Sequence, residues 1–154
     1  MAAEMNVRVE TAPFDPGAET NAFLAAAEGA GAAVTFTGIV RSLPDQQVAI
    51  LTLECYPELA VNQIGKIIAE ATERFRLLDA TVIHRYGQLK AGEPIMQVMT
   101  VAAHRQAAFE GAEFLMDYLK TDAPFWKKEQ SPDGTERWVE AKEQDDEARE
   151  RWTR

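Results

Sequence analysis

Four short apolar runs dominate this sequence and restrict the folds that it can adopt. Each run is rich in β-branched and aromatic residues, which favour β-strands. The runs cover residues 32–40, 48–56, 80–87 and 94–103. Val7 and Val9 alternate with polar neighbours and predict one more short strand at a sheet edge. We expect a polar loop over residues 42–47 and a turn-rich connection over residues 88–94.

Helical spacing of apolar residues appears in two segments between the expected strands. The first begins at Pro57, and five residues form its apolar face: Ile64, Ile67, Ile68, Ala71 and Phe75. The second covers residues 106–120. A third, short and alanine-rich helix opens at Asp15-Pro16, a typical N-cap pair, and ends before Gly29.

The C-terminal part of the sequence has the pattern of a hairpin followed by a charged tail. Residues 125–130 and 136–141 read as two strands, and the SPDGT segment between them has the residues of a turn. Residues 143–154 predict a charged, exposed helix. Strands and helices thus follow one another without strict alternation, which favours an α+β fold with a mixed or antiparallel sheet over a doubly wound one.

The composition narrows the class of protein. A chain of 154 residues has the size of one domain, so we expect a single domain over residues 1–154. A net charge of -9 argues against nucleic-acid binding, which requires clustered cations. The sequence shows no signal-peptide pattern and no apolar run long enough to span a membrane. Cys55 is the one cysteine, which excludes an internal disulfide and a CxxC zinc site. We expect a cytoplasmic enzyme or binding domain.

The segment MDYLKTDAPFWKKE, residues 116–129, is the strongest candidate for a functional site. It places Lys120 and Lys127 seven positions apart, with Phe125 and Trp126 between them, in an otherwise acidic chain. Cations beside aromatic rings suit a flat, anionic small molecule, and a lysine crowded by other cations becomes a usable proton donor or nucleophile. The alternative for Lys120 is stabilisation by the helix dipole alone. Neighbours on a strand point to opposite faces, so only one of Lys127 and Lys128 can share a site with Lys120.

Further candidate residues lie at the ends of the expected strands. His104 and Arg105 stand at a strand-to-helix junction, where backbone N–H groups and an arginine favour anions. The alternative is that His104 caps the helix and Arg105 is solvated. Arg41 follows a buried strand and is either an anion contact or a solvated strand end. His84 is more typical of a core or edge strand than of a ligand, and we expect no metal site.

Five blocks of the sequence, taken in order, resemble the large, catalytic subunit of molybdopterin synthase. They leave out only the N-terminal segment, the loop after Arg41 and the charged tail. The combination of HR with MDYLKxxAPFWKKE is long and unusual, which makes the resemblance specific. The blocks are GAAVTFTGIVR (31–41), LECYP (53–57), VIHRYGQLKAGE (82–93), AHRQAAFEGAEFLMDYLKTDAPFWKKE (103–129) and DGTERWVEA (133–141).

The resemblance implies an α+β fold of the α/β-hammerhead type and a homodimer. The homodimer would bind two copies of a small ubiquitin-like sulfur-carrier subunit and form a heterotetramer. Each carrier would insert a C-terminal Gly-Gly tail that ends as a thiocarboxylate. Its sulfur would pass to cyclic pyranopterin monophosphate and form the dithiolene of molybdopterin, with no metal or organic cofactor.

The resemblance also assigns roles to individual residues. Lys120 and Lys127 match essential lysines. From the chemistry of the reaction we expect Lys120 to be the central acid/base and Lys127 to orient the pterin or share proton transfer. Five further residues match anion-binding or pocket positions: Arg41, His104, Arg105, Phe36 and Met116. Lys142 stands where relatives can have an arginine, so the charge of a possible phosphate contact is kept but the bidentate fork is lost.

Two other classes of function remain as alternatives. A non-catalytic adaptor for a ubiquitin-like partner would lose only partner affinity when Lys120 or Lys127 is replaced. A phosphate-ester enzyme would turn over without any carrier protein, but the sequence lacks the acidic metal-binding cluster that such enzymes usually have.

Overall fold

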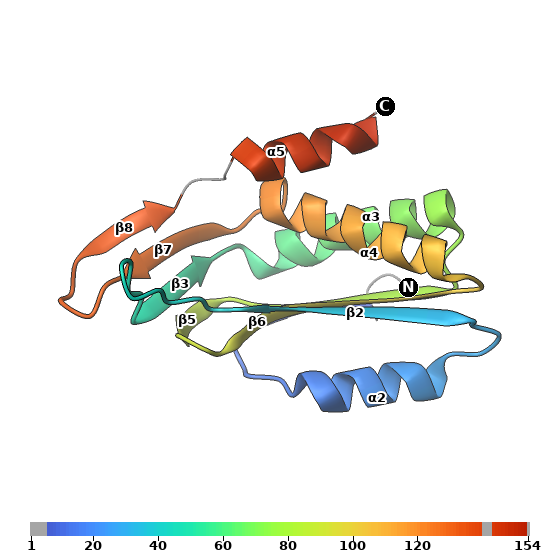
Figure 1. Ribbon diagram of the computed structural model, residues 1–154, viewed down its shortest axis with the longest axis horizontal. Coiled ribbons are helices and arrows are strands. Elements are labelled where there is room, and N and C mark those ends of the chain that lie inside the picture. The colour runs from blue at the N-terminus through green and yellow to red at the C-terminus, as the bar shows by residue number, and fades with distance from the viewer. Residues whose placement is uncertain (1–5, 140–142, 154) are drawn as a thin grey trace.

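The computed structural model describes residues 6–139 and 143–153, which form two four-stranded sheets with helices around the larger one (Figure 1). The strands are β1 (Val7–Glu10), β2 (Ala32–Ile39), β3 (Ile50–Glu54), β4 (Asp79–Arg85), β5 (Gly87–Lys90), β6 (Pro94–Ala102), β7 (Trp126–Gln130) and β8 (Glu136–Val139). The helices are α2 (Pro16–Ala26), α3 (Pro57–Phe75), α4 (Arg105–Thr121) and α5 (Glu143–Glu150), followed by the short 3-10 helix η1 (Arg151–Thr153).

The larger sheet has the strand order β1-β4-β6-β2. β1 pairs with β4 in parallel, and β6 is antiparallel to both β4 and β2. Helices α3 and α4 cover one face of this sheet and α2 covers the other (Figure 1). The predicted α+β class with a mixed sheet is confirmed.

The smaller sheet, of order β5-β3-β7-β8, lies at one end of the larger one (Figure 1). The predicted C-terminal hairpin is present as β7 and β8, which are antiparallel. The expectation of a turn-rich connection over residues 88–94 is wrong in part, because Gly87–Lys90 forms the strand β5 against β3. Gly87 has a φ of 88°, which lets the chain turn directly from β4 into β5, and Leu89 is fully buried there.

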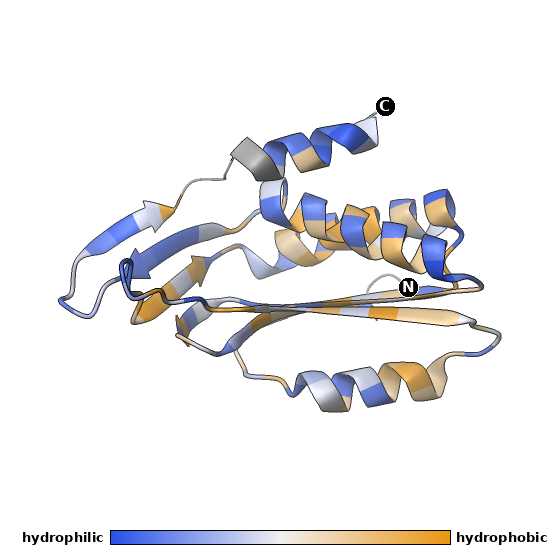
Figure 2. Ribbon diagram, in the orientation of Figure 1, coloured by the Kyte–Doolittle hydropathy of each residue, from blue (hydrophilic) through white to orange (hydrophobic). Residues whose placement is uncertain are grey.

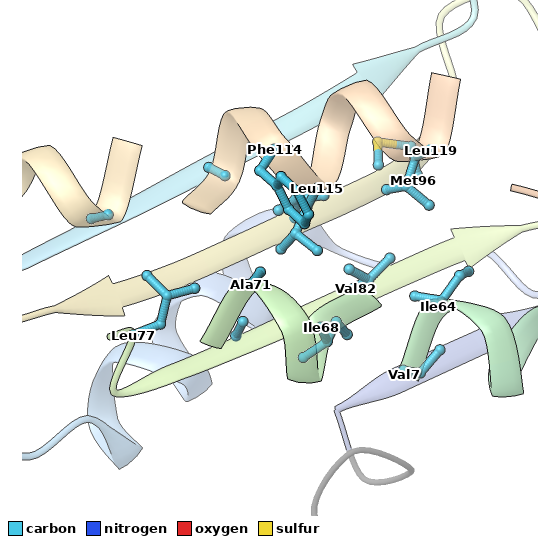
Figure 3. Close-up of a cluster of buried hydrophobic side chains, with 14 of the residues drawn as sticks. Val7, Ile64, Ile68, Ala71, Leu77, Val82, Met96, Phe114, Leu115 and Leu119 are labelled. Atoms are coloured by element: carbon cyan, nitrogen blue, oxygen red, sulfur yellow. The ribbon is translucent and has the colours of Figure 1, made fainter. Parts of the chain in front are cut away.

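The main core lies between the larger sheet and the helices α3 and α4. The predicted apolar face of α3 places Ile64, Ile68 and Ala71 in this core, against Val82 of β4 (Figure 3). Leu115 and its neighbours on α4 supply the remaining side chains of this core. Burial of each large aliphatic side chain contributes about 1.5–3 kcal/mol, so the packing holds α4 firmly over the sheet.

The charged tail is only partly as predicted. Figure 2 shows α5 as a mostly hydrophilic helix, in agreement with the sequence. The residues after it are not simply exposed, because the Trp152 ring packs edge-on against Phe75 and Phe114, each with ring centroids 5.5 Å away. The Trp152 indole Nε1 also donates a hydrogen bond of 2.5 Å to Asp117. One apolar residue in a charged run gives no periodic signal, so the sequence did not reveal this anchor.

Within the described residues, none of the helices combines the length and apolar character that a membrane crossing needs.

Candidate functional site

Lys120 and Lys127 come together at the end of the larger sheet that adjoins the smaller sheet. Lys120 lies in the last turn of α4, and Lys127 is the second residue of β7, paired with Leu53 of β3. Both lysine charges act on the imidazole of His84, at the end of β4, and contribute to lowering its pKa. His84 is thus one residue on which both lysine charges act.

His84 is a buried neighbour of this lysine pair. Its side chain is 4% exposed, and Nδ1 lies 2.8 Å from the carbonyl oxygen of Arg85. Burial lowers the pKa of His84 to about 4, and the charges of Lys127 and Lys120 act in the same direction. The imidazole is consequently neutral at pH 7. The sequence correctly predicted a core residue, but its strand of apolar neighbours gave no sign that it adjoins the site.

Phe36 lies on β2 and Met116 lies on α4. Met116 lies one turn before Lys120 on the same side of α4 and packs half-buried against the core. Phe36 on β2 is 41% exposed, which suits a side chain that contacts a ligand better than one that fills a core. A Cβ atom on Gly38 would lie 3.3 Å from the Met96 sulfur and 3.7 Å from the Phe36 ring, so glycine preserves the space between these side chains.

Lys128 belongs to the opposite face of β7. Its ammonium lies 5.5 Å from the centre of the Trp138 ring and 3.6 Å from the Glu136 carboxylate, both on β8. The predicted division of the two neighbouring lysines between opposite faces holds, and Lys128 is engaged away from Lys120.

Arg41 lies just beyond the end of β2 and lines a pocket of about 310 Å³. The pocket wall includes Val139, the residue that pairs with Lys127 across the hairpin. A second cation in the pocket, Arg137, is bound to Glu129 at 2.7 Å. Arg41 thus stands at the same end of the molecule as the lysines.

His104 and Arg105 lie at the opposite end of α4 and are both exposed. The helix begins at Arg105 and carries Lys120 in its last turn, so at 1.5 Å per residue the two backbones are about 22 Å apart. His104 occupies the N-cap position of α4, as the alternative predicted, but its side chain makes no capping hydrogen bond to the described residues. One copy of the chain therefore does not bring His104 and Arg105 to the lysines.

Comparison with known proteins identifies the family to which this arrangement belongs. The family model for the MoaE protein matches residues 9–122, which is well over half of the chain. The chain belongs to the MoaE protein family. A relative from Cereibacter sphaeroides, named molybdopterin synthase catalytic subunit, is 53% identical over 148 residues, which cover 96% of this chain and 100% of the relative.

Solved structures of the MoaE family have the same fold. The molybdopterin biosynthesis MoaE protein from Burkholderia ambifaria aligns with a TM-score of 0.81 at 46% identity, covering 97% of this chain and 98% of that one. A crystal structure of molybdopterin synthase from Staphylococcus aureus aligns with a TM-score of 0.77 at 26% identity, covering 86% and 96% of the two chains.

In this MoaE-family chain, three carboxylates that lie close to the lysines in sequence bind arginines. Asp117 binds Arg151 at 2.9 Å as well as the Trp152 indole, Asp122 binds Arg149 at 3.4 Å, and Glu129 binds Arg137. Across the described residues, no group of three His, Cys, Asp or Glu side chains is arranged to hold a metal ion. Lys142, the last of the candidate residues from the sequence, lies outside the described residues.

Proposed function

We propose that this chain is the catalytic subunit of a molybdopterin synthase. It would take sulfur from the C-terminal thiocarboxylate of a small ubiquitin-like carrier subunit and transfer it to cyclic pyranopterin monophosphate, forming the dithiolene of molybdopterin. The observation that carries the proposal is the pair Lys120 and Lys127 beside a neutral, buried His84, in a chain that belongs to the MoaE family.

The chemistry of sulfur transfer fits a cationic site with apolar walls. In each transfer the carrier sulfur forms a C–S bond to the substrate while a C–O bond of the substrate breaks. Water then cleaves the C–S bond of the resulting thioester on the carrier side, so the sulfur stays on the substrate and the carrier is left as a carboxylate. The thiocarboxylate carbon passes through a tetrahedral oxyanion, and the leaving oxygen needs a proton. Ammonium groups supply both the positive charge and the proton.

The position of each residue suggests its part in this reaction. Lys120 is the central acid/base, since it lies at the end of a rigid helix. Lys127 orients the pterin or shares the proton transfer. Phe36 and Met116 provide the apolar surface against which a flat pterin and a Gly-Gly tail pack, and Arg41 binds a phosphate oxygen.

A homodimer would complete the site. His104 and Arg105 lie about 22 Å from Lys120 along α4, too far for one bound substrate to contact all three. A symmetric dimer brings the same surface of each subunit to the other, so the partner subunit can supply these two residues. The functional complex is then a homodimer that carries two copies of the carrier, a heterotetramer.

The proposed enzyme is a single-domain protein that works without a cofactor. Residues 1–154 form one catalytic domain, supported by the core that the larger sheet shares with α3 and α4. The protein works in the cytoplasm, and the reaction needs no organic cofactor or metal, since the transferred atom arrives on the carrier. Lys142 is a further contact to the substrate phosphate.

The test is to mix the purified chain with a thiocarboxylated carrier and cyclic pyranopterin monophosphate, and to measure the dithiolene product. Product that depends on all three components supports the proposal. A chain that binds the carrier but forms no product would instead be an adaptor, and product without any carrier would indicate a phosphate-ester enzyme.

A further inference from the structure

The imidazole of His84 connects the two segments that carry the lysines, yet the reaction outlined above gives it no part. Successive residues of β4 point to opposite faces, so His84 shares with Val82 the face that α3 and α4 cover. Its ring stacks on the ring of Phe125, with centroids 3.9 Å apart and planes inclined by 13°. Phe125 lies in the connection between α4 and β7, so the stack fixes this connection to the end of β4.

The hydrogen bond of His84 determines which ring nitrogen carries the proton. Nδ1 lies 2.8 Å from the Arg85 carbonyl oxygen, and a carbonyl oxygen can only accept. Nδ1 is therefore the N–H donor. In a neutral imidazole the other nitrogen, Nε2, then has an unprotonated lone pair and can accept a hydrogen bond.

The stack on Phe125 brings the start of β7, which carries Lys127, to the His84 ring, and the charges of Lys127 and Lys120 both act on this ring. An ammonium has three N–H donors and no acceptor, so a neutral nitrogen lone pair is a suitable partner. A carboxylate in the same place would cancel the positive charge that an anionic substrate needs. Asp117, Asp122 and Glu129, which lie close to the lysines in sequence, bind Arg151, Arg149 and Arg137.

We propose that His84 is a positioning residue for sulfur transfer, which accepts a hydrogen bond from the Lys127 ammonium at Nε2 while Phe125 clamps the ring. The imidazole orients the ammonium toward the substrate and leaves its charge intact. This inference rests on the function proposed above. It adds that the Lys127 ammonium needs an uncharged hydrogen-bond acceptor beside it.

Two amide variants separate the two nitrogens of the ring. The amide of His84→Gln reaches the place of Nε2 and keeps an acceptor there. The shorter amide of His84→Asn reaches only the place of Nδ1 and keeps the bond to the Arg85 carbonyl. His84→Phe keeps the size and the stacking on Phe125 but has neither nitrogen.

The assay is single-turnover dithiolene formation with a preformed carrier thiocarboxylate. We expect His84→Asn and His84→Phe to slow turnover about 10- to 100-fold, the effect of one hydrogen bond to a charged group. His84→Gln should stay within about threefold of the parent chain, and carrier affinity should not change. Equal rates for His84→Asn and His84→Gln would overturn the proposal, whereas a parent chain that forms no product would overturn the proposed function instead.

A second measurement needs neither carrier nor substrate and does not depend on the folding of the His84 variants. The ¹⁵N resonances of the His84 ring in the parent chain should show the proton on Nδ1. Lys127→Ala should shift the Nε2 resonance, and the control Lys128→Ala should leave it in place. A proton on Nε2, or a Nε2 resonance that ignores Lys127→Ala, would overturn the proposal.

Discussion

Because α4 is long, we expect two variants that are each inactive to regain activity when they are combined in one dimer. Lys120 and Arg105 occupy opposite ends of this helix, about 22 Å apart, so we expect each site of the homodimer to combine Lys120 of one subunit with Arg105 of the other. Lys120→Ala and Arg105→Ala should each be inactive as a homodimer. A mixed dimer of the two variants should have one site with both residues intact and one site with neither.

The expected recovery follows from the statistics of assembly. When the two variants are produced in equal amounts, half of the dimers are mixed, and each mixed dimer has one working site of two. The preparation should therefore regain about one quarter of the parent activity per subunit. Dimers purified through two different tags, which contain only mixed pairs, should regain about one half.

The assay is dithiolene formation by co-expressed, doubly tagged subunits with saturating thiocarboxylated carrier. The matched control combines Lys120→Ala with Lys127→Ala. Both of these lysines belong to the site of one chain, so every site in that mixed dimer lacks one of them and no recovery is expected. If the Lys120→Ala and Arg105→Ala pair recovers no more activity than this control, the two-subunit site is wrong.

Three further predictions concern stability. Gly31→Ala should lower the free energy of unfolding by about 2–4 kcal/mol in urea titrations, because the new methyl group collides with the Ala103 carbonyl; an unchanged midpoint would contradict this contact. The pKa of His84 is about 4 in the folded chain against 6.5 as its ordinary value, so only the unfolded chain binds this proton between those pH values. Acidification from pH 6.5 to 4 should then lower the free energy of unfolding by about 3 kcal/mol. His84→Phe, measured beside the parent chain across this pH range, should not show this loss. Trp152→Ala should cost about 2 kcal/mol in thermal or urea unfolding, whereas Trp138→Ala, at a side chain that is 58% exposed, should cost little; equal losses would refute the anchoring of the tail.

The sequence predicted the elements whose signals are local and long. The apolar face of α3 runs from Ile64 to Phe75, about three turns, and the runs that became β2 and β6 are nearly continuous in β-branched and other apolar residues. β5 was missed because Leu89 is one buried residue between polar neighbours, and a strand of this length depends on its partner β3 for identity. Trp152 was missed because it, too, is a single apolar residue between polar neighbours.

The candidate site shows a similar division. The sequence suggested the lysine pair because Lys120 and Lys127 lie close together in it, on either side of a helix end. The sequence could not place His84 beside the segment that carries the lysines, because the contact is a ring stack with Phe125, a residue far from His84 in the sequence. The resemblance grouped Arg105 with the lysines, but α4 places Arg105 and Lys120 at its opposite ends, which the sequence did not reveal.

The most direct test of the account is the single-turnover rate of Lys120→Ala in complex with a thiocarboxylated carrier, measured beside Lys128→Ala. The account predicts that both variants bind the carrier as the parent chain does. It also predicts that Lys120→Ala forms no detectable dithiolene and that Lys128→Ala forms it at the parent rate. Undiminished dithiolene formation by Lys120→Ala would contradict the assignment of this lysine as the acid/base of sulfur transfer.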